Sequence, residues 1–334
     1  MVAERAEQGA AVIGNLDLAA VDAELHGLVD DTTPGSERDQ GTFRFVANNS
    51  DAISQMTRRR FLGLSAGTAA LAACGGGSPE QESAATKWFA DQTIVADGTP
   101  QRTIWSLADS DGNLGDLAPD TFDYTVLDPD SAEIASGVAH KHADGVLQPY
   151  YPIAVAFERS GVHEFLFATA DHGRHVGFAS PGLPEDTTLF WPGDRFPSVV
   201  TPTLDNDAGV AQICTRSELC PFHEISLDVA LASDRRTVMI VTTPAFCGTV
   251  IMCGPVLEIL IDEIGTGGYD VDVLHAEVYI DPQPDAPGDL APVVVASGVT
   301  YEPYIFLFDR DGTVIARLDH IWDRAELREL LSLS

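Results

Sequence analysis

Four cysteines in the second half of the chain are the residues best suited to chemistry. They are Cys214, Cys220, Cys247 and Cys253. Within each of the two close pairs, five residues separate the cysteines. Thiols at this spacing can form structural disulfides, exchange disulfides with other proteins or bind soft metal ions. Four cysteines allow three pairings, and the sequence alone does not select one of them.

Cys247 stands where a thiol should be reactive. It lies between an apolar run, residues 238–242, and the apolar helical pattern of residues 256–264. A cysteine at a helix N-terminus meets unpaired backbone N–H groups and the positive end of the helix dipole, which lower a thiol pKa from about 8.5 toward 7. We therefore expect Cys247 to be the nucleophile and Cys253 to resolve the mixed disulfide that it forms.

The distance between these two cysteines restricts how they can pair. Six residues of continuous helix rise about 9 Å, whereas a disulfide needs Cα atoms about 4.4–6.8 Å apart. Pairing of Cys247 with Cys253 therefore requires an irregular first turn, which Gly248 would permit.

The segments that must position these cysteines alternate between strands and helices. Residues 238–242 are a continuous apolar run rich in β-branched side chains, which is typical of a buried parallel strand. The expected strands are residues 238–242, 271–280, 304–308 and 313–318, and the expected helices are residues 225–232, 256–264 and 323–331. This β-α-β order, followed by a hairpin and a last helix, predicts an α/β domain over residues 205–334.

The cysteine segment of this domain resembles the active site of thioredoxins. Residues 243–248 contain the aromatic-Cys-Gly step that follows a buried strand in that family, and Pro255 matches the proline that kinks the active-site helix. Residues 301–304 are similar to the loop that carries a cis-proline, here Pro303. The resemblance covers about residues 210–333. It implies a thioredoxin-like fold and thiol–disulfide exchange by Cys247 and Cys253, with Pro303 shaping the substrate groove.

The sequence also departs from the thioredoxin pattern. The second cysteine of that family follows the first by three positions, where this chain has Val250. The buried acid on the preceding strand is replaced by Val241, and Glu302 adds negative charge that opposes a thiolate. In a second possible register, residues 253–256 resemble the Cys-Gly-Pro-Cys motif with valine as the last residue.

Two other functions stay open at this stage. The first is a non-catalytic protein of the same fold, in which both cysteine pairs are structural. The second is copper handling, because Sco-type copper chaperones are anchored thioredoxin folds that bind copper through two cysteines and a histidine. The candidate histidines are His223, His275 and His320, of which His275 lies in an apolar strand and is expected to be a core residue. We predict no metal or other cofactor.

Cys214 and Cys220 lie just before the first expected helix of the domain. We expect them to form a local structural disulfide that holds the start of the domain. The alternative is a redox relay to Cys247 or Cys253.

An all-β pattern precedes this domain, over residues 88–195. Apolar and polar residues alternate around Phe122, Ile153 and Phe165, and turn signals separate these stretches, for example at residues 109–113. Short strands at this spacing suggest a sandwich of immunoglobulin-like type, without a disulfide between its sheets.

The segment before the sandwich reads as an export signal and an anchor. Arginines at residues 58–60, which are typical of a twin-arginine export signal, precede an apolar run that is too short to span a bilayer, which needs about 20 residues. Residues 71–74 resemble the lipobox of prokaryotic lipoproteins, which implies a signal over residues 56–73 and lipidation of Cys74. We expect residues 74–87 to be a flexible tether, and residues 1–55 to be an acidic leader that is disordered or precedes the true start at Met56.

The charge of the chain narrows the choice of partners. A formal net charge of −32 argues against binding to nucleic acid, whose phosphates need Lys and Arg. It also argues against lying flat on an anionic membrane. We expect a lipid-anchored protein on the extracytoplasmic face of the cell membrane, with the thiols or disulfides of exported proteins as partners.

Overall fold

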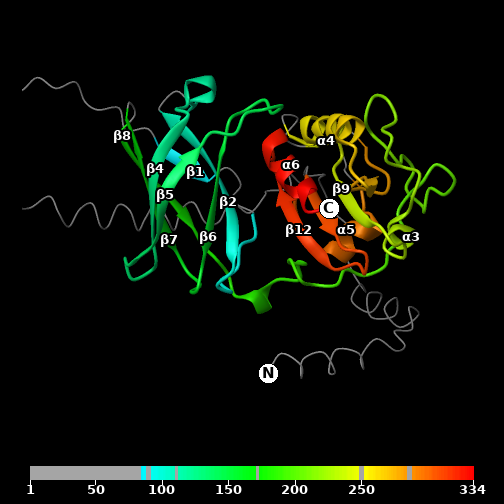
Figure 1. The fold of residues 1–334 in the computed structure, drawn as a ribbon, viewed down its shortest axis with the longest axis horizontal. Coiled ribbons are helices and arrows are strands. Elements are labelled where there is room, and N and C mark those ends of the chain that lie inside the picture. The colour runs from blue at the N-terminus through cyan, green and yellow to red at the C-terminus, as the bar shows by residue number, and fades with distance from the viewer. Residues whose placement is uncertain (1–83, 88–91, 110–111, 171–172, 248–251, 284–287) are drawn as a thin grey trace, which may run out of the picture. The chain divides into compact units, whose positions relative to one another are not determined.

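The computed structural model describes residues 84–87, 92–109, 112–170, 173–247, 252–283 and 288–334 (Figure 1). All of these residues belong to one compact unit, Gly76–Ser334. The expected leader, the export signal and Cys74 lie outside the described residues, as does most of the expected tether. The last four residues of that tether form strand β1 (Ala84–Lys87), which pairs with strand β2. The composition of the tether does not signal this pairing, because the partner strand supplies the hydrogen bonds.

Two antiparallel sheets are built from the first part of the described chain. One contains β1, β2 (Pro100–Asp109), β3 (Gly112–Asn113) and β6 (Tyr151–Ala156). The other has the order β5-β4-β7-β8, formed by Glu133–His140, Thr121–Leu127, His163–Thr169 and Gly173–Ala179. Short 3₁₀ helices, η1 (Gly115–Leu117) and η2 (Pro184–Asp186), lie in the connections.

Aromatic side chains from both sheets share one core. Trp105 of β2 lies with its ring centroid 4.5 Å from that of Phe165 of β7, and Phe122 of β4 lies 4.5 Å from Tyr151 of β6. All four rings are buried. The alternation around Phe122 and Phe165 therefore places one face of each strand against the opposite sheet, as the sequence predicted.

The second part of the described chain contains a third sheet with the order β10-β9-β11-β12. Its strands are Val271–Ala276, Arg236–Val241, Tyr304–Phe308 and Val314–Asp319. Its helices are α3 (Leu227–Ala230), α4 (Cys253–Gly267), α5 (Pro292–Ser297) and α6 (Arg324–Ser332). Strand β10 is parallel to β9, and the other pairs are antiparallel. The predicted β-α-β order, hairpin and last helix are present, whereas helix α5 was not predicted.

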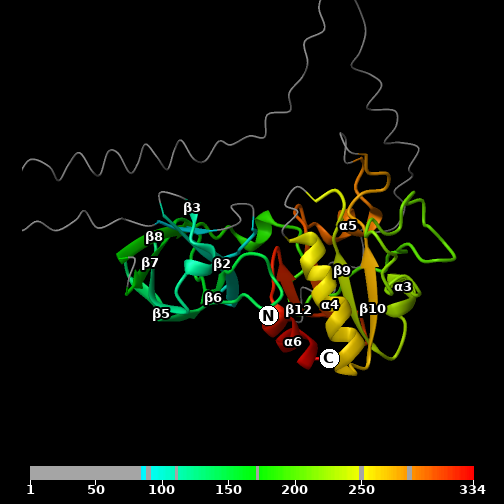
Figure 2. The same cartoon turned by 90° about the horizontal axis from the view of Figure 1, so that it is seen from above.

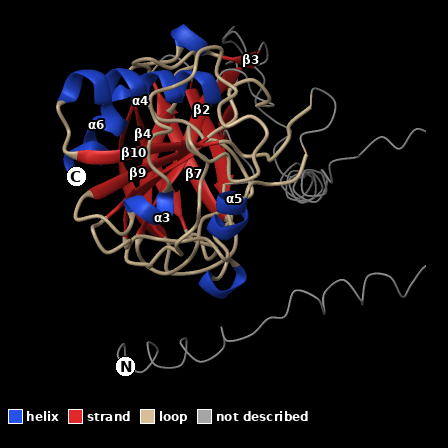
Figure 3. Cartoon of the chain, turned by 90° about the vertical axis from the view of Figure 1, so that its right-hand side faces the viewer, coloured by secondary structure: helices blue, strands red, loops and turns tan. Residues whose placement is uncertain are grey.

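Both faces of this sheet are covered. Val238 and Ile240 of β9 pack in one cluster with apolar residues of α4 and α6, and Met239 and Val241 pack in another with residues of α3 and α5. Figures 2 and 3 show α4 and α6 lying together on one side of these strands, and Figure 3 shows α3 and α5 on the other. The continuous apolar run of β9 follows from this arrangement, because both of its faces are buried.

Strand β2 and helix α6 are joined by an ion pair inside the same compact unit. Arg102 donates to both carboxylate oxygens of Glu326, at 2.7 and 2.6 Å. The hydroxyl of Tyr150 also donates to Glu326 and accepts from the backbone N–H of Asp323 at 2.7 Å. The carboxylate of Glu326 is thus buried with its charge balanced and its hydrogen bonds made.

Candidate functional site

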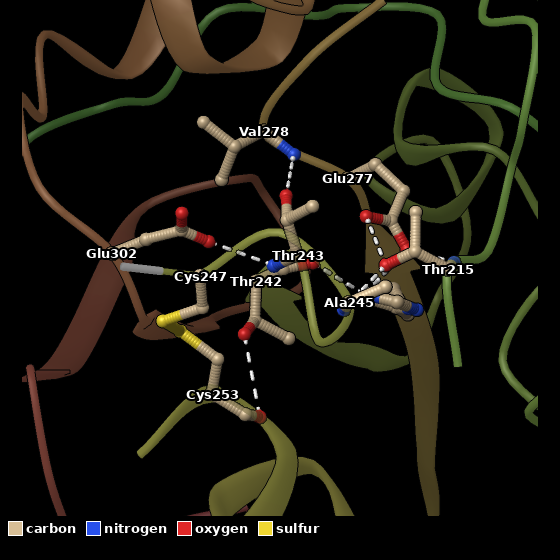
Figure 4. The surroundings of a disulfide bond; sticks show 10 residues. Thr215, Thr242, Thr243, Ala245, Cys247, Cys253, Glu277, Val278 and Glu302 are labelled. Carbon is tan, nitrogen blue, oxygen red and sulfur yellow. Dashed lines mark hydrogen bonds and ion pairs between the residues drawn. A yellow bond between two sulfur atoms is a disulfide. The ribbon is translucent and has the colours of Figure 1, made fainter. Parts of the chain in front are cut away.

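A disulfide joins the end of β9 to the start of α4. Cys247 and Cys253 are bonded, with their Cα atoms 6.2 Å apart, inside the range that disulfides accept (Figure 4). After β9 the chain turns, and the carbonyl of Thr243 accepts from the N–H groups of Phe246 and Cys247 at 3.1 and 2.9 Å. The described helix α4 begins only at Cys253.

The position of α4 corrects part of the argument from the sequence. The N–H groups and the positive dipole end at the start of α4 serve Cys253, its first residue, and not Cys247. The two cysteines pair because Cys247 precedes the helix, so the 9 Å rise of a continuous helix does not separate them. The side chain of Cys247 is 7% exposed and that of Cys253 is 0% exposed. Cys247 is therefore the cysteine nearer to solvent.

Glu302 lies beside this disulfide, and Pro303 follows it directly before β11. A carboxylate oxygen of Glu302 lies within 4.8 Å of both sulfur atoms, and its Oε2 accepts from the backbone N–H of Thr243 at 2.7 Å. The peptide bond between Glu302 and Pro303 is cis, as the resemblance implied. Burial, with a contribution from the nearby charge of Glu277, raises the pKa of Glu302 to about 7. Near neutral pH, the carboxyl group beside the disulfide can therefore hold or release a proton.

The other two cysteines do not form the disulfide that the sequence predicted. Cys214 and Cys220 are free thiols, and both are buried. Their side chains gather with two histidines in a group that we call the Cys2His2 cluster. Its members are Cys214, Cys220, His223 and His275. Their ligand atoms all lie within 4.8 Å of one another.

The contacts inside the Cys2His2 cluster are close. The sulfur of Cys220 lies 3.2 Å from Nε2 of His223 and 3.4 Å from Nδ1 of His275, and the sulfur of Cys214 lies 3.9 Å from the same Nδ1. Hydrogen bonding with Cys220, and then with the two histidines, lowers the pKa of Cys214. The sequence placed His275 in an apolar strand as a core residue; it is buried in β10, but it faces two thiols.

The sequence contained only part of the signal for this cluster. Cys214, Cys220 and His223 lie close together in the chain, but the five residues between the cysteines exceed the two to four that are typical of zinc sites. His275 completes the group from a strand that is 55 residues beyond Cys220. The strand pattern alone gives no sign of that contact.

Hydrogen bonds connect the segment of Cys214 to the turn that holds Cys247. Thr215 donates from its backbone N–H and its hydroxyl to Glu277, at 2.5 and 3.0 Å, and its Oγ1 accepts from the N–H of Ala245 at 3.2 Å (Figure 4). The hydroxyl of Thr243 accepts from the N–H of Val278 at 2.9 Å. Glu277 is buried, so these bonds fix the two segments to the end of β10.

The surroundings of the disulfide differ from a copper site of the Sco type. Among the described residues, the group of possible metal ligands around Cys247 and Cys253 contains Glu302 and no histidine. The third candidate, His320, stacks on the ring of Tyr301 with centroids 4.2 Å apart. The described part of the chain therefore offers no Cys2His set at this disulfide.

Comparisons with known proteins add little to this geometry. No protein-family model matches the chain, and no curated protein matches it. A solved structure of trypsin-activated alpha-2-macroglobulin from Escherichia coli is similar over 73% of this chain and 13% of that chain, with 11% identity and a TM-score of 0.24. In the described ranges, none of the helices has the length and apolar character needed to cross a bilayer.

Proposed function

We propose that residues 205–334 form a thioredoxin-like domain that exchanges thiols and disulfides with exported proteins. The observation that carries this proposal is the disulfide of Cys247 with Cys253, which lies between the end of β9 and the start of α4, beside Glu302, the residue before Pro303. The element order around it contains the β-α-β unit, the hairpin and the last helix that the sequence predicted, with helix α5 in addition. On this proposal the protein is a thiol–disulfide oxidoreductase.

The exposure of the two cysteines supports the roles that we propose for them. In the reduced protein, the thiolate of Cys247 attacks a disulfide of the partner, forms a mixed disulfide and releases one partner thiolate. The thiolate of Cys253, at the N-terminus of α4, then attacks the sulfur of Cys247 and releases the second partner thiolate. The partner disulfide is reduced to two thiols while the Cys247–Cys253 dithiol is oxidised. A low-molecular-weight or protein dithiol returns the pair to the reduced form, and the reverse sequence oxidises a partner.

Glu302 supports the proton transfers of this cycle. Its carboxyl group lies within 4.8 Å of both sulfur atoms, and its pKa is raised to about 7 by burial. A group that titrates near the working pH is suited to take a proton from a thiol and to return it to a leaving thiolate.

The remaining parts of the chain complete the proposal. The two antiparallel sheets, which contain strands β1 to β8, are proposed to be an immunoglobulin-like sandwich that precedes the exchange domain. The arginines at residues 58–60 and the lipobox-like residues 71–74 support twin-arginine export and a lipid anchor at Cys74. These motifs place the protein, on this proposal, on the extracytoplasmic face of the cell membrane, where exported thiols and disulfides are available.

One observation favours a second candidate, a non-catalytic binding protein of the same fold. Both sulfur atoms of the disulfide belong to buried side chains, whereas exchange needs access for a partner sulfur. In this case the disulfide stabilises the connection of β9 to α4 and undergoes no turnover.

A redox titration of the full chain separates the two candidates. The chain would be equilibrated in graded thiol–disulfide buffers, and the Cys247–Cys253 bond quantified by mass spectrometry. An exchange protein should titrate between about −120 and −270 mV, whereas a structural disulfide should stay oxidised below about −300 mV.

The Cys247→Ser variant gives the matching functional result. We expect it to lose disulfide exchange with a model protein substrate, while the Arg159→Ala variant, at a half-exposed position outside both cysteine sites, keeps it. Equal exchange rates in Cys247→Ser and the unaltered protein would remove the assigned role of Cys247.

A further inference from the structure

We propose that the Cys2His2 cluster is a structural binding site for one zinc ion. The site is separate from the disulfide of Cys247 and Cys253, and it holds whether or not that disulfide takes part in exchange. Two thiolates and two imidazoles are a complete ligand set for Zn²⁺, which prefers tetrahedral sites of sulfur and nitrogen atoms. On binding, the two thiols lose their protons to solvent and each sulfur forms a bond to the metal.

The distances in the cluster fit a shared metal ion. Tetrahedral bonds of about 2.3 Å to sulfur and about 2.0–2.1 Å to nitrogen place bound sulfur and nitrogen atoms about 3.5 Å apart. The corresponding distances are 3.2 Å for Cys220 and His223, 3.4 Å for Cys220 and His275, and 3.9 Å for Cys214 and His275. The four side chains thus surround a volume of the size that one metal ion requires.

The hydrogen bonds of His275 orient it as a ligand. Its Nε2 lies 2.9 Å from the carbonyl oxygen of Thr242, which can only accept, so Nε2 carries the proton. In the neutral imidazole that a metal ion binds, Nδ1 then carries the lone pair, and it is the atom that faces the two sulfurs. Glu277 lies 3.8 Å from the same Nε2. A carbonyl or carboxylate behind a histidine is the usual support for a metal-bound imidazole.

Burial distinguishes a structural site from a catalytic one. The four residues of the cluster are between 1% and 7% exposed. A catalytic zinc ion needs a coordination position open to water or substrate, whereas structural zinc has four protein ligands and is closed. The four protein ligands and their burial match the structural type.

The segment that carries three of the ligands is long and irregular, and a bound metal ion would hold it in place. No helix or strand is present in the described chain between η2, which ends at Asp186, and α3, which begins at Leu227. Connections of this length without secondary structure are uncommon in compact domains. A metal ion bound to Cys214, Cys220 and His223 on one side and to His275 of β10 on the other would fix this segment to the sheet.

Metal analysis of the full chain tests the proposal. The protein would be expressed with zinc, iron and copper all present in the medium, dialysed, and its metals measured by plasma mass spectrometry. We expect about one zinc ion per chain, and X-ray absorption at the zinc edge should give two sulfur and two nitrogen neighbours. Less than about one-tenth of a zinc ion per chain, or one copper ion in its place, would overturn the assignment.

Variants locate the ion. Cys214→Ser and His275→Gln should each lose most of the bound zinc, whereas Cys247→Ser, the matched control from the other cysteine pair, should keep it. Zinc that is retained in both cluster variants would show that the metal is bound elsewhere and would contradict the proposal.

A measurement on the unaltered chain tests the site without variants, which could fail to fold. With zinc bound, Cys214 and Cys220 should resist alkylation, and both should become reactive after a chelator removes the metal. A disulfide between Cys214 and Cys220, found by mass spectrometry in the purified protein, would also refute the site.

Discussion

At the scale of single residues, Glu302 sets the charge around the disulfide. Its carboxylate accepts from the N–H of Thr243, and burial raises its pKa to about 7. The charged groups that act on it are Glu277, which raises its pKa, and His275, which lowers it. A carboxyl group with a raised pKa prefers its neutral form in the folded protein, so folding is favoured at low pH.

This preference gives a pH-dependent stability. The stabilising contribution of Glu302 to the free energy of unfolding is fully present below the ordinary pKa of this residue, 4.5. It is lost as the pH rises through the pKa in the folded protein, about 7. We expect the unaltered protein to lose on the order of 1–3 kcal/mol of unfolding free energy from this residue over that range. The Glu302→Gln variant keeps the acceptor for Thr243 without the charge and should lack this loss. Denaturant unfolding of the unaltered protein and of Glu302→Gln at several pH values measures the two pH dependences.

The difference between the stability curves of Glu302→Gln and the unaltered protein isolates the contribution of Glu302. Glu277 also has a raised pKa, of about 7, and contributes a slope of the same sign in both proteins. Parallel stability curves for Glu302→Gln and the unaltered protein would contradict the expectation.

The sequence predicted which cysteines form the disulfide, and it named the four residues of the Cys2His2 cluster as candidates without predicting that they lie together. Cys247, Cys253 and Pro303 were found because each lies at a fixed position relative to a recognisable strand. The cluster depends on a contact between Cys214 and His275, which are 61 residues apart in the chain. Hydrophobic periodicity assigned His275 to the core, and the close spacing of two cysteines in a chain with an export signal suggested a local disulfide. Neither argument describes a contact between distant residues.

At the scale of elements, β8 depends on a glycine that faces a tryptophan. A Cβ atom at Gly177 would lie 2.2 Å from a ring carbon of Trp105. That ring is fully buried, and its N–H donates to Thr103 at 2.8 Å, so it cannot move aside without losing packing and a hydrogen bond. The close approach of β8 to β2 therefore requires glycine at this position.

The Gly177→Ala variant should lower the unfolding free energy by about 1–3 kcal/mol, the usual effect of an overpacked core. Denaturant unfolding followed by tryptophan fluorescence would measure it. Gly182→Ala is the matched control, since no atom lies within 4 Å of the added carbon, and it should change stability by less than about 0.5 kcal/mol. Equal effects of the two substitutions would show that the ring of Trp105 adapts.

Most strands and helices were predicted, and α5 shows why one was not. Three consecutive valines in this helix, residues 293–295, have a pattern that favours a strand. Pro292 at the first helical position and Gly298, in the left-handed conformation at its end, allow the helix to start and stop. Packing of Val293 and Val294 against the sheet then outweighs the local preference.

At the scale of the whole described unit, Arg102 connects the first sheet to α6. Its guanidinium binds Glu326 through two hydrogen bonds and donates to the carbonyl oxygens of Asp319 and Ile321 at 3.1 and 2.6 Å. Both side chains of the ion pair are mostly buried. Removal of one partner leaves a buried charge without compensation.

We expect Arg102→Ala to lower the unfolding free energy by about 3–5 kcal/mol. The control is Arg159→Ala, which breaks ion pairs with Asp128 and Asp130 at a half-exposed position and should lower it by less than about 1 kcal/mol. Calorimetric unfolding of both variants gives the comparison. A small effect of Arg102→Ala would mean that water reaches Glu326 and replaces the lost partner.

One peptide unit, between Thr242 and Thr243, is hydrogen-bonded to a residue of the Cys2His2 cluster and to a residue beside the disulfide. Its carbonyl oxygen accepts from His275 of the Cys2His2 cluster, and its N–H donates to Glu302 beside the disulfide. Hydrogen bonds in such a chain polarise one another, so a change at one end alters the other. With zinc in the cluster, the two centres share a coupling free energy that is the same in both directions. If bound zinc changes the dithiol–disulfide equilibrium constant by some factor, reduction of the disulfide then changes the affinity for zinc by the same factor.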